Sequence, residues 1–120
     1  MRTLDEHKVN PANDILNVTV VDEPGPGGAN HEYNIIGGSA RDTRISFQNG
    51  PINVDRNSVN GLTHEVLLAI VADRMRSFQK GPYACKANAC ALTHIEEALH
   101  WLQQRTLERI RRGVEGTHAV

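Results

Sequence analysis

The Gly81-Pro82 pair, which separates two long amphipathic runs, constrains the fold of this 120-residue chain more than any other feature. Proline lacks an amide hydrogen and restricts the residue before it, so a helix that reaches this pair has to end there. The run before the pair starts after Thr63, a natural N-cap, and its apolar residues recur at helical spacing as far as Phe78. The sequence therefore predicts a first helix that ends at Lys80.

The second run is predicted to form a helix that begins between Lys86 and Asn88 and ends at about Arg112, before Gly113. Asn88 is the candidate N-cap of this helix. Four apolar residues step along one face by three, four and three positions, which is typical of a seam between helices: Leu92, Ile95, Leu99 and Leu102. Because the connection between the two runs is short, the predicted helices form an antiparallel hairpin over about residues 62–112.

A change of period at Asn60-Gly61 divides the chain, because the residues before it follow the patterns of strands. Residues 1–14 carry no clear period and are predicted to form a loose arm. The pair Asn49-Gly50 is a strong signal for a tight turn. Strands are predicted at 15–22, 31–36 and 43–48, with a short fourth strand at 52–54. The fold class is therefore α+β, with a small sheet over about residues 15–56 followed by the hairpin, in a single domain over 1–120.

The composition limits the kinds of partner. A net charge of −1 removes the general attraction that a nucleic-acid-binding protein has for polyanions, so any such partner needs a local patch. The longest apolar run, Val66 to Ala72, is far shorter than the roughly 20 residues that cross a bilayer, and we expect a soluble cytoplasmic protein with no membrane partner. Cys85 and Cys90 fit neither a metal spacing nor a disulfide framework, and we expect both to be reduced packing residues.

The turn between the helices is richer in functional groups than a simple connector requires. It combines two aromatic rings, two ammonium groups and an amide, which are Phe78, Tyr83, Lys80, Lys86 and Asn88. A ring stacks on a base, an amide pairs with the edge of a base, and a cation binds a phosphate. These residues are therefore candidates for a nucleotide site. The structural alternative is that Phe78 only packs the end of a helix and Asn88 only caps the next one.

The second candidate is a stripe of arginines near the end of the second helix. Arg105, Arg109 and Arg112 are spaced by four and three positions, so they share one side of the helix. Their paired N–H donors suit phosphates. Two alternatives stay open, namely a solvated helix face and a small nucleic-acid-binding regulator that uses the stripe on a phosphate backbone.

Catalytic patterns are missing from the sequence. The six histidines include no pair at the spacing of a zinc protease, and no serine, cysteine or pair of carboxylates lies in a recognisable nucleophile or acid–base pattern. The sequence therefore favours binding without turnover, and no metal or cofactor is expected.

Five segments, in order along the chain, resemble the Thoeris anti-defence one family of phage proteins. They are residues 45–52, 60–63, 78–88, 93–102 and 112–118. The helical half also resembles the hairpin of the anti-CBASS two sponges of phages. The resemblance implies a small antiparallel sheet packed on a helical hairpin, which agrees with the periodicity of the sequence.

The resemblance also implies a function. Members of that family sequester the glycocyclic ADP-ribose signals made by bacterial Toll/interleukin-receptor (TIR) enzymes, without cleaving them, in the cytoplasm of the infected host. The residues expected to bind the ligand are Phe78, Asn88 and Arg105 from the family, with Lys86, Arg109 and Arg112 added by proximity.

Assembly follows from the resemblance too. Relatives form dimers with the signal at the subunit interface, or hexamers that hold cyclic di- or trinucleotides at separate sites. We therefore expect a homo-oligomer, either a dimer or a hexamer, that takes a small-molecule ligand and neither DNA nor RNA. A phosphodiesterase that acts on the same nucleotides is a further alternative.

Overall fold

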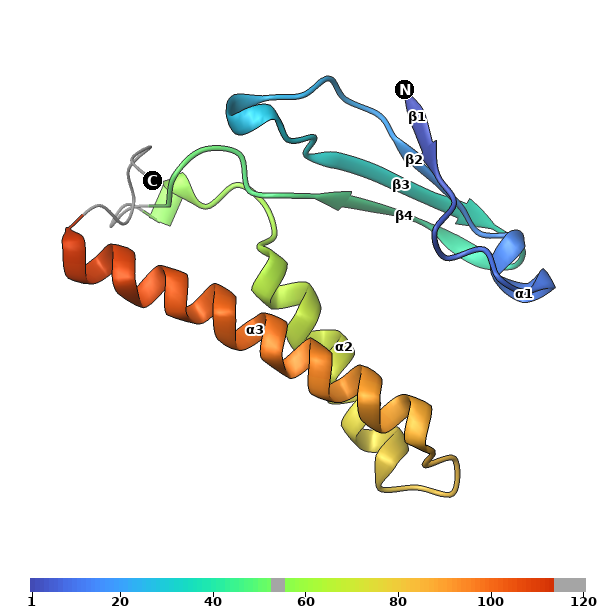
Figure 1. Cartoon of the computed structure of the whole chain (residues 1–120). Helices are drawn as coiled ribbons and strands as arrows, with labels where there is room; N and C mark the ends of the chain where they lie inside the picture. The colour runs from blue at the N-terminus through green and yellow to red at the C-terminus, as the bar shows by residue number, and fades with distance from the viewer. Residues whose placement is uncertain (53–55, 114–120) are drawn as a thin grey trace. The chain divides into compact units, whose positions relative to one another are not determined.

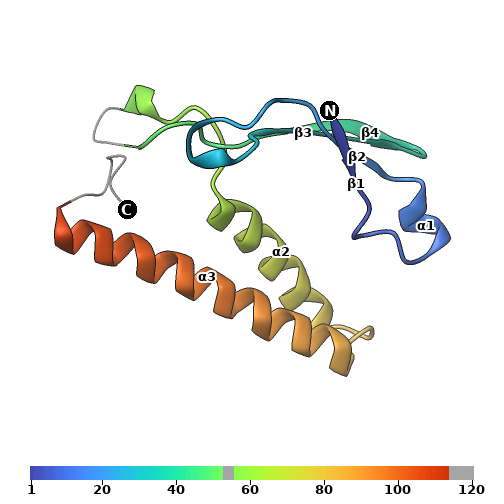
Figure 2. The same ribbon diagram turned by 45° about the horizontal axis from the view of Figure 1, so that its top comes forward.

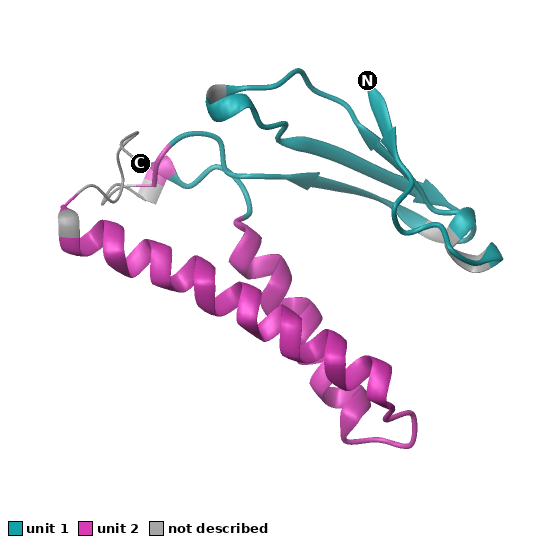
Figure 3. Cartoon of the chain, in the orientation of Figure 1, with its two compact units in different colours: residues 1–50, 59–62 teal, residues 51–58, 63–120 magenta. Residues whose placement is uncertain are grey.

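The computed structural model describes residues 1–52 and 56–113, and the chain divides into two compact units (Figure 3). The first unit contains residues 1–50 and 59–62 and carries the described strands. The second unit contains residues 51–58 and the chain from Thr63 onward, including the two long helices.

A four-stranded antiparallel sheet forms most of the first unit, and its strands are neighbours in the order of the sequence (Figure 1). The strands are β1 Arg2–Leu4, β2 Asn17–Val20, β3 Glu32–Gly37 and β4 Ala40–Ser46. The connections contain a short helix, α1 Pro11–Asp14, and a 3-10 turn, η1 Pro26–Gly28; a second 3-10 turn, η2 Arg56–Ser58, belongs to the second unit. The strands predicted at 15–22, 31–36 and 43–48 correspond to β2, β3 and β4.

Apolar side chains share one face of the sheet. Val20 of β2 lies opposite Tyr33 of β3, which lies opposite Ile45 of β4. Val20 is only 1% exposed, and the Tyr33 ring packs edge-on against Phe47 with 5.6 Å between the ring centroids. Side chains directly opposite each other on one face are in contact, so this row stabilises the pairing of the three strands.

The N-terminal residues are ordered, so the prediction of a loose arm over residues 1–14 is wrong. Thr3 of β1 pairs with Thr19 of β2, and the His7 ring hydrogen-bonds to the Leu16 carbonyl at 2.7 Å. A strand of three residues is too short to show a period in the sequence, which is why the pattern did not reveal β1.

Gly37 is required where β3 turns into β4. Its φ is +153°, which L side chains rarely adopt, and a Cβ at this position would overlap the backbone carbonyl of Ile15. The close approach of these two backbones brings the chain before β2 against the β3–β4 turn.

Paired hydrogen bonds join two segments of the first unit, just before the chain enters the helices. Gln48 N–H donates to the Leu62 carbonyl at 2.8 Å, and Gln48 Oε1 accepts from Asn60 N–H at 2.9 Å. The Asn60 side chain accepts from Asn49 N–H at 2.8 Å and donates to the Asn49 carbonyl at 2.7 Å. We call this arrangement the Gln48–Asn60 clamp.

Gly61 completes the clamp, because a Cβ there would lie 2.5 Å from the carbonyl carbon of Phe47. Only a glycine allows the two backbones to approach this closely. The predicted fourth strand at 52–54 would lie between the two sides of the clamp. Ile52 is in no strand, and residues 53 and 54 lie outside the described residues.

The second unit is a hairpin of two long helices, α2 His64–Gln79 and α3 Lys86–Arg112 (Figure 2). Thr63 Oγ1 accepts from Val66 N–H at 3.3 Å, which confirms Thr63 as the N-cap. Lys80, where the helix was predicted to end, is the C-cap that follows its last residue. The order of an antiparallel sheet followed by two helices confirms the predicted α+β class.

The N-cap of α3 is Cys85. Its Sγ accepts from Asn88 N–H at 3.4 Å, so the prediction that Asn88 caps this helix is wrong because the helix already begins at Lys86. Cys85 and Cys90 are free thiols and both are exposed, so the expectation that they pack in the interior is wrong as well.

A fully buried alanine and an ion pair contribute to the packing of the two helices. Ala72 of α2 is fully buried, and its small side chain lets the helices approach closely. Arg76 Nε and Nη2 lie 3.2 and 3.0 Å from Glu96 Oε2 of α3, so the last turns of α2 lie beside the first half of α3. In residues 1–52 and 56–113, no helix combines the length and the apolar character that a bilayer span requires.

Candidate ligand site at the helical turn

Hydrogen bonds fix the turn between α2 and α3. Gln79 Oε1 accepts from Cys85 N–H and Gln79 Nε2 donates to the Cys85 carbonyl, both at 3.2 Å. Gly81 N–H donates to the Phe78 carbonyl at 3.1 Å, a bond of the 3-10 type that closes the end of α2. The residues of the turn are therefore held in one conformation relative to the helix ends.

An open hollow of about 620 Å³ lies on the outer side of α2 at this turn. It is lined by α2 residues at helical spacing together with the turn, and the lining residues are Ile70, Asp73, Arg74, Ser77, Phe78, Gly81, Pro82 and Tyr83. The Phe78 ring is half-buried, whereas Tyr83 is 74% exposed. The hollow therefore offers two aromatic rings, a cation, a carboxylate and a hydroxyl to a ligand.

Arg74 covers the Phe78 ring inside this hollow. The guanidinium carbon lies 5.0 Å from the ring centroid, within the range of a cation–π contact. Sequence reasoning selected Phe78 but not Arg74. The sequence did contain a signal for Arg74, because residues four positions apart on a helix, such as Arg74 and Phe78, lie on the same face.

Three of the predicted ligand residues lie around the turn, but only one lines the hollow. Phe78 does so from the last turn of α2. Lys86 and Asn88 belong to the first turn of α3; Lys86 is exposed and Asn88 is half-buried. Neither is among the lining residues.

The predicted arginine stripe lies far from the turn. Arg105 follows Asn88 by 17 residues on the same helix, which corresponds to about 25 Å along its axis. This span exceeds the combined reach of an arginine side chain and one small cyclic nucleotide. One chain therefore does not bring Arg105 and Asn88 together on one ligand.

The three arginines also differ in exposure. Arg105 is exposed, whereas Arg109 is only 7% exposed. Arg112 is the last residue of α3, and its side chain lies outside the described part of the structure. The stripe therefore has a regular spacing without being a uniform solvent-facing surface.

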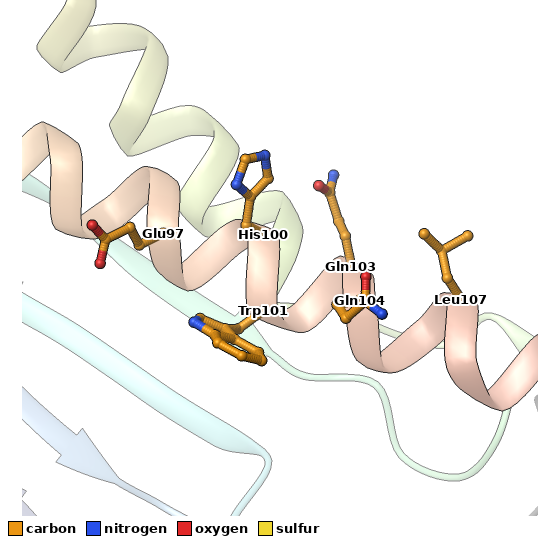
Figure 4. A pocket seen from close by; sticks show the side chains of 6 residues that line it. All are labelled: Glu97, His100, Trp101, Gln103, Gln104 and Leu107. Atoms are coloured by element: carbon orange, nitrogen blue, oxygen red, sulfur yellow. The ribbon is translucent and has the colours of Figure 1, made fainter.

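A second hollow, of about 660 Å³, follows the surface of α3. The described residues that line it all belong to this helix, and they are Glu97, His100, Trp101, Gln103, Gln104 and Leu107. Trp101 is 74% exposed and projects from a different side of α3 than His100 (Figure 4). Because these side chains diverge around one helix, they form an exposed surface rather than a convergent set of ligand groups.

Two carboxyl groups with lowered pKa values, Asp22 and Glu32, lie in the sheet unit. Partial burial raises the pKa of Asp22, but N–H groups of His31 and Glu32, at 2.9 and 3.2 Å, and the Asn30 amide stabilise the carboxylate and lower it overall. Bonds from Ser46 Oγ at 2.6 Å and Arg44 Nε at 3.1 Å lower the pKa of Glu32. These groups organise the loop before β3 and the pairing of β3 with β4.

Among residues 1–52 and 56–113, no three His, Cys, Asp or Glu side chains are grouped as metal ligands would be. The hollow at the turn itself contributes one carboxylate, Asp73, and no histidine or cysteine.

Comparison with known proteins identifies the family. Residues 39–107 match the model of the Acb2/Tad1 hairpin domain, a region that includes β4, α2 and most of α3. A protein of Bacillus phage SBSphiJ7 named Thoeris anti-defense 1 is 40% identical over 94 residues, which cover 78% of this chain and 65% of that protein. The chain thus spans less than two thirds of the length of this relative. On this evidence the chain belongs to the Acb2/Tad1 hairpin family.

Proposed function

We propose that this chain binds and sequesters the glycocyclic ADP-ribose signal of bacterial TIR enzymes, without cleaving it, and so blocks Thoeris immunity in the cytoplasm of the infected bacterium. The observation that carries the proposal is the hollow at the α2–α3 turn, which lies inside the family-matched region and contains Phe78. The name of the phage relative supports the anti-Thoeris part of the proposal.

The groups at the turn fit a cyclic ligand that contains an adenine, ribose and a diphosphate. Phe78 and Tyr83 offer faces on which adenine stacks, and the Asn88 amide suits the edge of a base or a ribose hydroxyl. Lys86 lies at the start of α3 and adds a positive charge beside the positive, N-terminal end of the helix dipole. We propose that Phe78, Asn88 and Lys86 bind the ligand from one chain.

We further propose that Arg105 binds the same ligand from a second copy of the chain. About 25 Å of helix separates Arg105 from Asn88, so both residues contact one ligand only if they come from different chains. An antiparallel arrangement of two α3 helices would bring the Arg105 end of one copy beside the Asn88 end of the other. We extend this assignment to Arg112, which follows Arg105 on the same helix, but not to Arg109, whose side chain is only 7% exposed. A hexamer built from such pairs is compatible with this arrangement.

The apolar surface of the hairpin supports association of copies. Trp101, Leu107 and Ile110 of α3 are 74%, 56% and 57% exposed, and Ile70 of α2 is 60% exposed. Covering large apolar side chains of this kind is a principal source of favourable free energy in homo-oligomer interfaces.

Binding without turnover is consistent with the lining of the hollow. Ser77 Oγ donates its hydrogen bond to the Asp73 carbonyl at 3.2 Å, so no base activates this hydroxyl. A protein that acts by sequestration needs a dissociation constant well below the signal concentration. A nanomolar constant, about −12 kcal/mol, meets that requirement.

The alternative function, a nucleic-acid-binding regulator that uses the arginine stripe, has less support. A protein of this kind needs Arg105, Arg109 and Arg112 to contact a phosphate backbone together, but Arg109 is buried. The net charge of −1 also gives no general attraction for nucleic acid.

Native mass spectrometry tests the proposal directly. The protein is incubated with glycocyclic ADP-ribose, cyclic di- and trinucleotides, linear ADP-ribose and a short DNA duplex, and the bound mass reports ligand, stoichiometry and assembly together. We expect glycocyclic ADP-ribose to be retained and to be recovered intact after heat denaturation. Recovery of a linear product would show that the protein hydrolyses its ligand and would overturn sequestration without cleavage, and retention of the duplex alone would favour the regulator.

A further inference from the structure

We propose that Arg74 is a ligand-binding residue that the Phe78 ring holds ready for the diphosphate of the ligand. This inference rests on the proposed function and assigns a role within the same site. It identifies a cation that the chain supplies itself, in addition to any arginine from a second copy.

The first support is the position of Arg74. Its guanidinium lies over the Phe78 ring at 5.0 Å from the centroid, and both residues line the hollow of about 620 Å³. A base that stacks on the part of the Phe78 ring that Arg74 leaves free therefore has the guanidinium within its immediate surroundings. A diphosphate attached to that base would lie within reach of the same group.

The second support is the contrast with Arg76, two residues further along α2. Arg76 directs two nitrogens at Glu96 Oε2, at 3.0 and 3.2 Å, so its charge is already neutralised within the hairpin. Arg74 has no ion pair among the described residues, and its contact with Phe78 leaves its N–H donors available. Of these two arginines, only Arg74 faces the hollow with an uncompensated charge.

The third support is the charge balance of the hollow. Its described lining includes one carboxylate, Asp73, and one guanidinium, Arg74. A diphosphate carries negative charge, and a site that holds it next to a carboxylate needs a cation at close range. A guanidinium provides two parallel N–H donors to phosphate oxygens, which a lysine ammonium does not.

Phe78 acts on Arg74 as a positioning residue as well as a stacking surface. A free arginine side chain samples many rotamers, and fixing one of them on binding has an entropic cost. The cation–π contact restricts the guanidinium to the hollow before the ligand arrives, which reduces that cost.

The test is isothermal titration of glycocyclic ADP-ribose into the full-length protein at about 50 and 300 mM salt. We expect Arg74→Ala to weaken binding at least about tenfold and to lower its salt dependence, because a screened charge interaction has been removed. Arg74→Lys is expected to restore the salt dependence with only part of the affinity. Arg76→Ala is the matched control, and its affinity and salt dependence should equal those of the unmodified protein.

A double-mutant cycle tests the positioning by Phe78. The loss of binding affinity caused by Arg74→Ala should be smaller when Phe78→Ala is already present, because the ring no longer orders the guanidinium. Circular dichroism and thermal unfolding verify that each variant is folded. Unchanged or tighter binding by folded Arg74→Ala would overturn the role of Arg74 and leave the proposed function standing. An absence of binding by the unmodified protein would overturn both.

Discussion

The side-chain amide of Gln79 bonds to both backbone groups of Cys85, accepting from its N–H and donating to its carbonyl at 3.2 Å each. This pairing copies the pattern of two residues in adjacent strands. It ties the last residue of α2 to the N-cap of α3, so the turn that carries Tyr83 is fixed at both ends.

Gln79→Ala should destabilise the protein by about 1–2 kcal/mol, because two hydrogen bonds are lost. Cys85 N–H is then left to water, while the Cys85 carbonyl keeps only the bond from Ala89 N–H at 3.0 Å. Chemical denaturation measures this change. Gln79→Glu is the informative companion, since its carboxylate still accepts from Cys85 N–H but no longer donates to the carbonyl. Its stability should therefore lie between those of Gln79→Ala and the unmodified protein. Equal stability of all three proteins would contradict this account of the turn.

Gly61→Ala should be strongly destabilising, by at least about 2 kcal/mol, because a Cβ would lie 2.5 Å from the carbonyl carbon of Phe47 and would push the two sides of the Gln48–Asn60 clamp apart. Gly81→Ala is the control. Its Cβ would meet the Ser77 carbonyl oxygen at 3.7 Å, an ordinary contact, so a change within about 0.5 kcal/mol is expected. Thermal unfolding of the two variants side by side measures the difference, and similar losses would argue against the clamp.

The lowered pKa of Asp22 predicts how the stability of the protein depends on pH. Its pKa in the folded protein is lower than the ordinary value of 3.8, so the carboxylate contributes stability at pH values above 3.8. That contribution is lost as the pH falls through the folded-state pKa, where the bonds from His31 and Glu32 N–H lose their charged acceptor. Asp22→Asn should be less stable at neutral pH and should show a shallower loss on acidification. Thermal unfolding between about pH 7 and pH 2.5 measures both effects. Glu23, the exposed carboxylate next to Asp22, provides the control. Glu23→Gln should lose as much stability on acidification as the unmodified protein does.

Phe78→Ala and Arg105→Ala should each weaken the binding of glycocyclic ADP-ribose by more than about tenfold while the fold is retained. Calorimetric titration gives the affinities. An unchanged affinity in either folded variant would remove that residue from the site.

Mixing these two variants tests whether the site is shared between chains. In a two-fold dimer, a heterodimer of Phe78→Ala and Arg105→Ala subunits contains one intact site, which combines the unmodified Phe78 of one subunit with the unmodified Arg105 of the other. After unfolding and refolding together in equal amounts, about a quarter of the original high-affinity sites should return. If no site returns although heterodimers are present, the ligand does not bridge the two positions.

Much of the fold could be predicted because the determining signals are local. Thr63 identifies the start of α2 and Gly81-Pro82 its end, since capping and the missing proline donor act within one helical turn. The strand β1 could not be predicted in this way. It has three residues, and it forms because β2 provides a partner more than ten residues away.

The site was only partly predictable for a related reason. The residue types at the turn indicated a nucleotide site, and the hollow that contains Phe78 is compatible with that. The burial of Arg109 depends on tertiary surroundings that its spacing does not reveal. The separation of Arg105 from Asn88, in contrast, follows from helix geometry alone, since 17 residues of one helix extend about 25 Å.

The Gln48–Asn60 clamp has a consequence for how this family can diversify. Because Gln48, Asn49 and Asn60 fasten the two ends of residues 50–59 to each other, the join between these ends does not depend on the length of the segment that it encloses. The entropic cost of enlarging a closed loop grows only slowly with its length. Evolution can therefore lengthen or shorten this segment, or insert a new recognition element into it, without breaking the hydrogen bonds that close it.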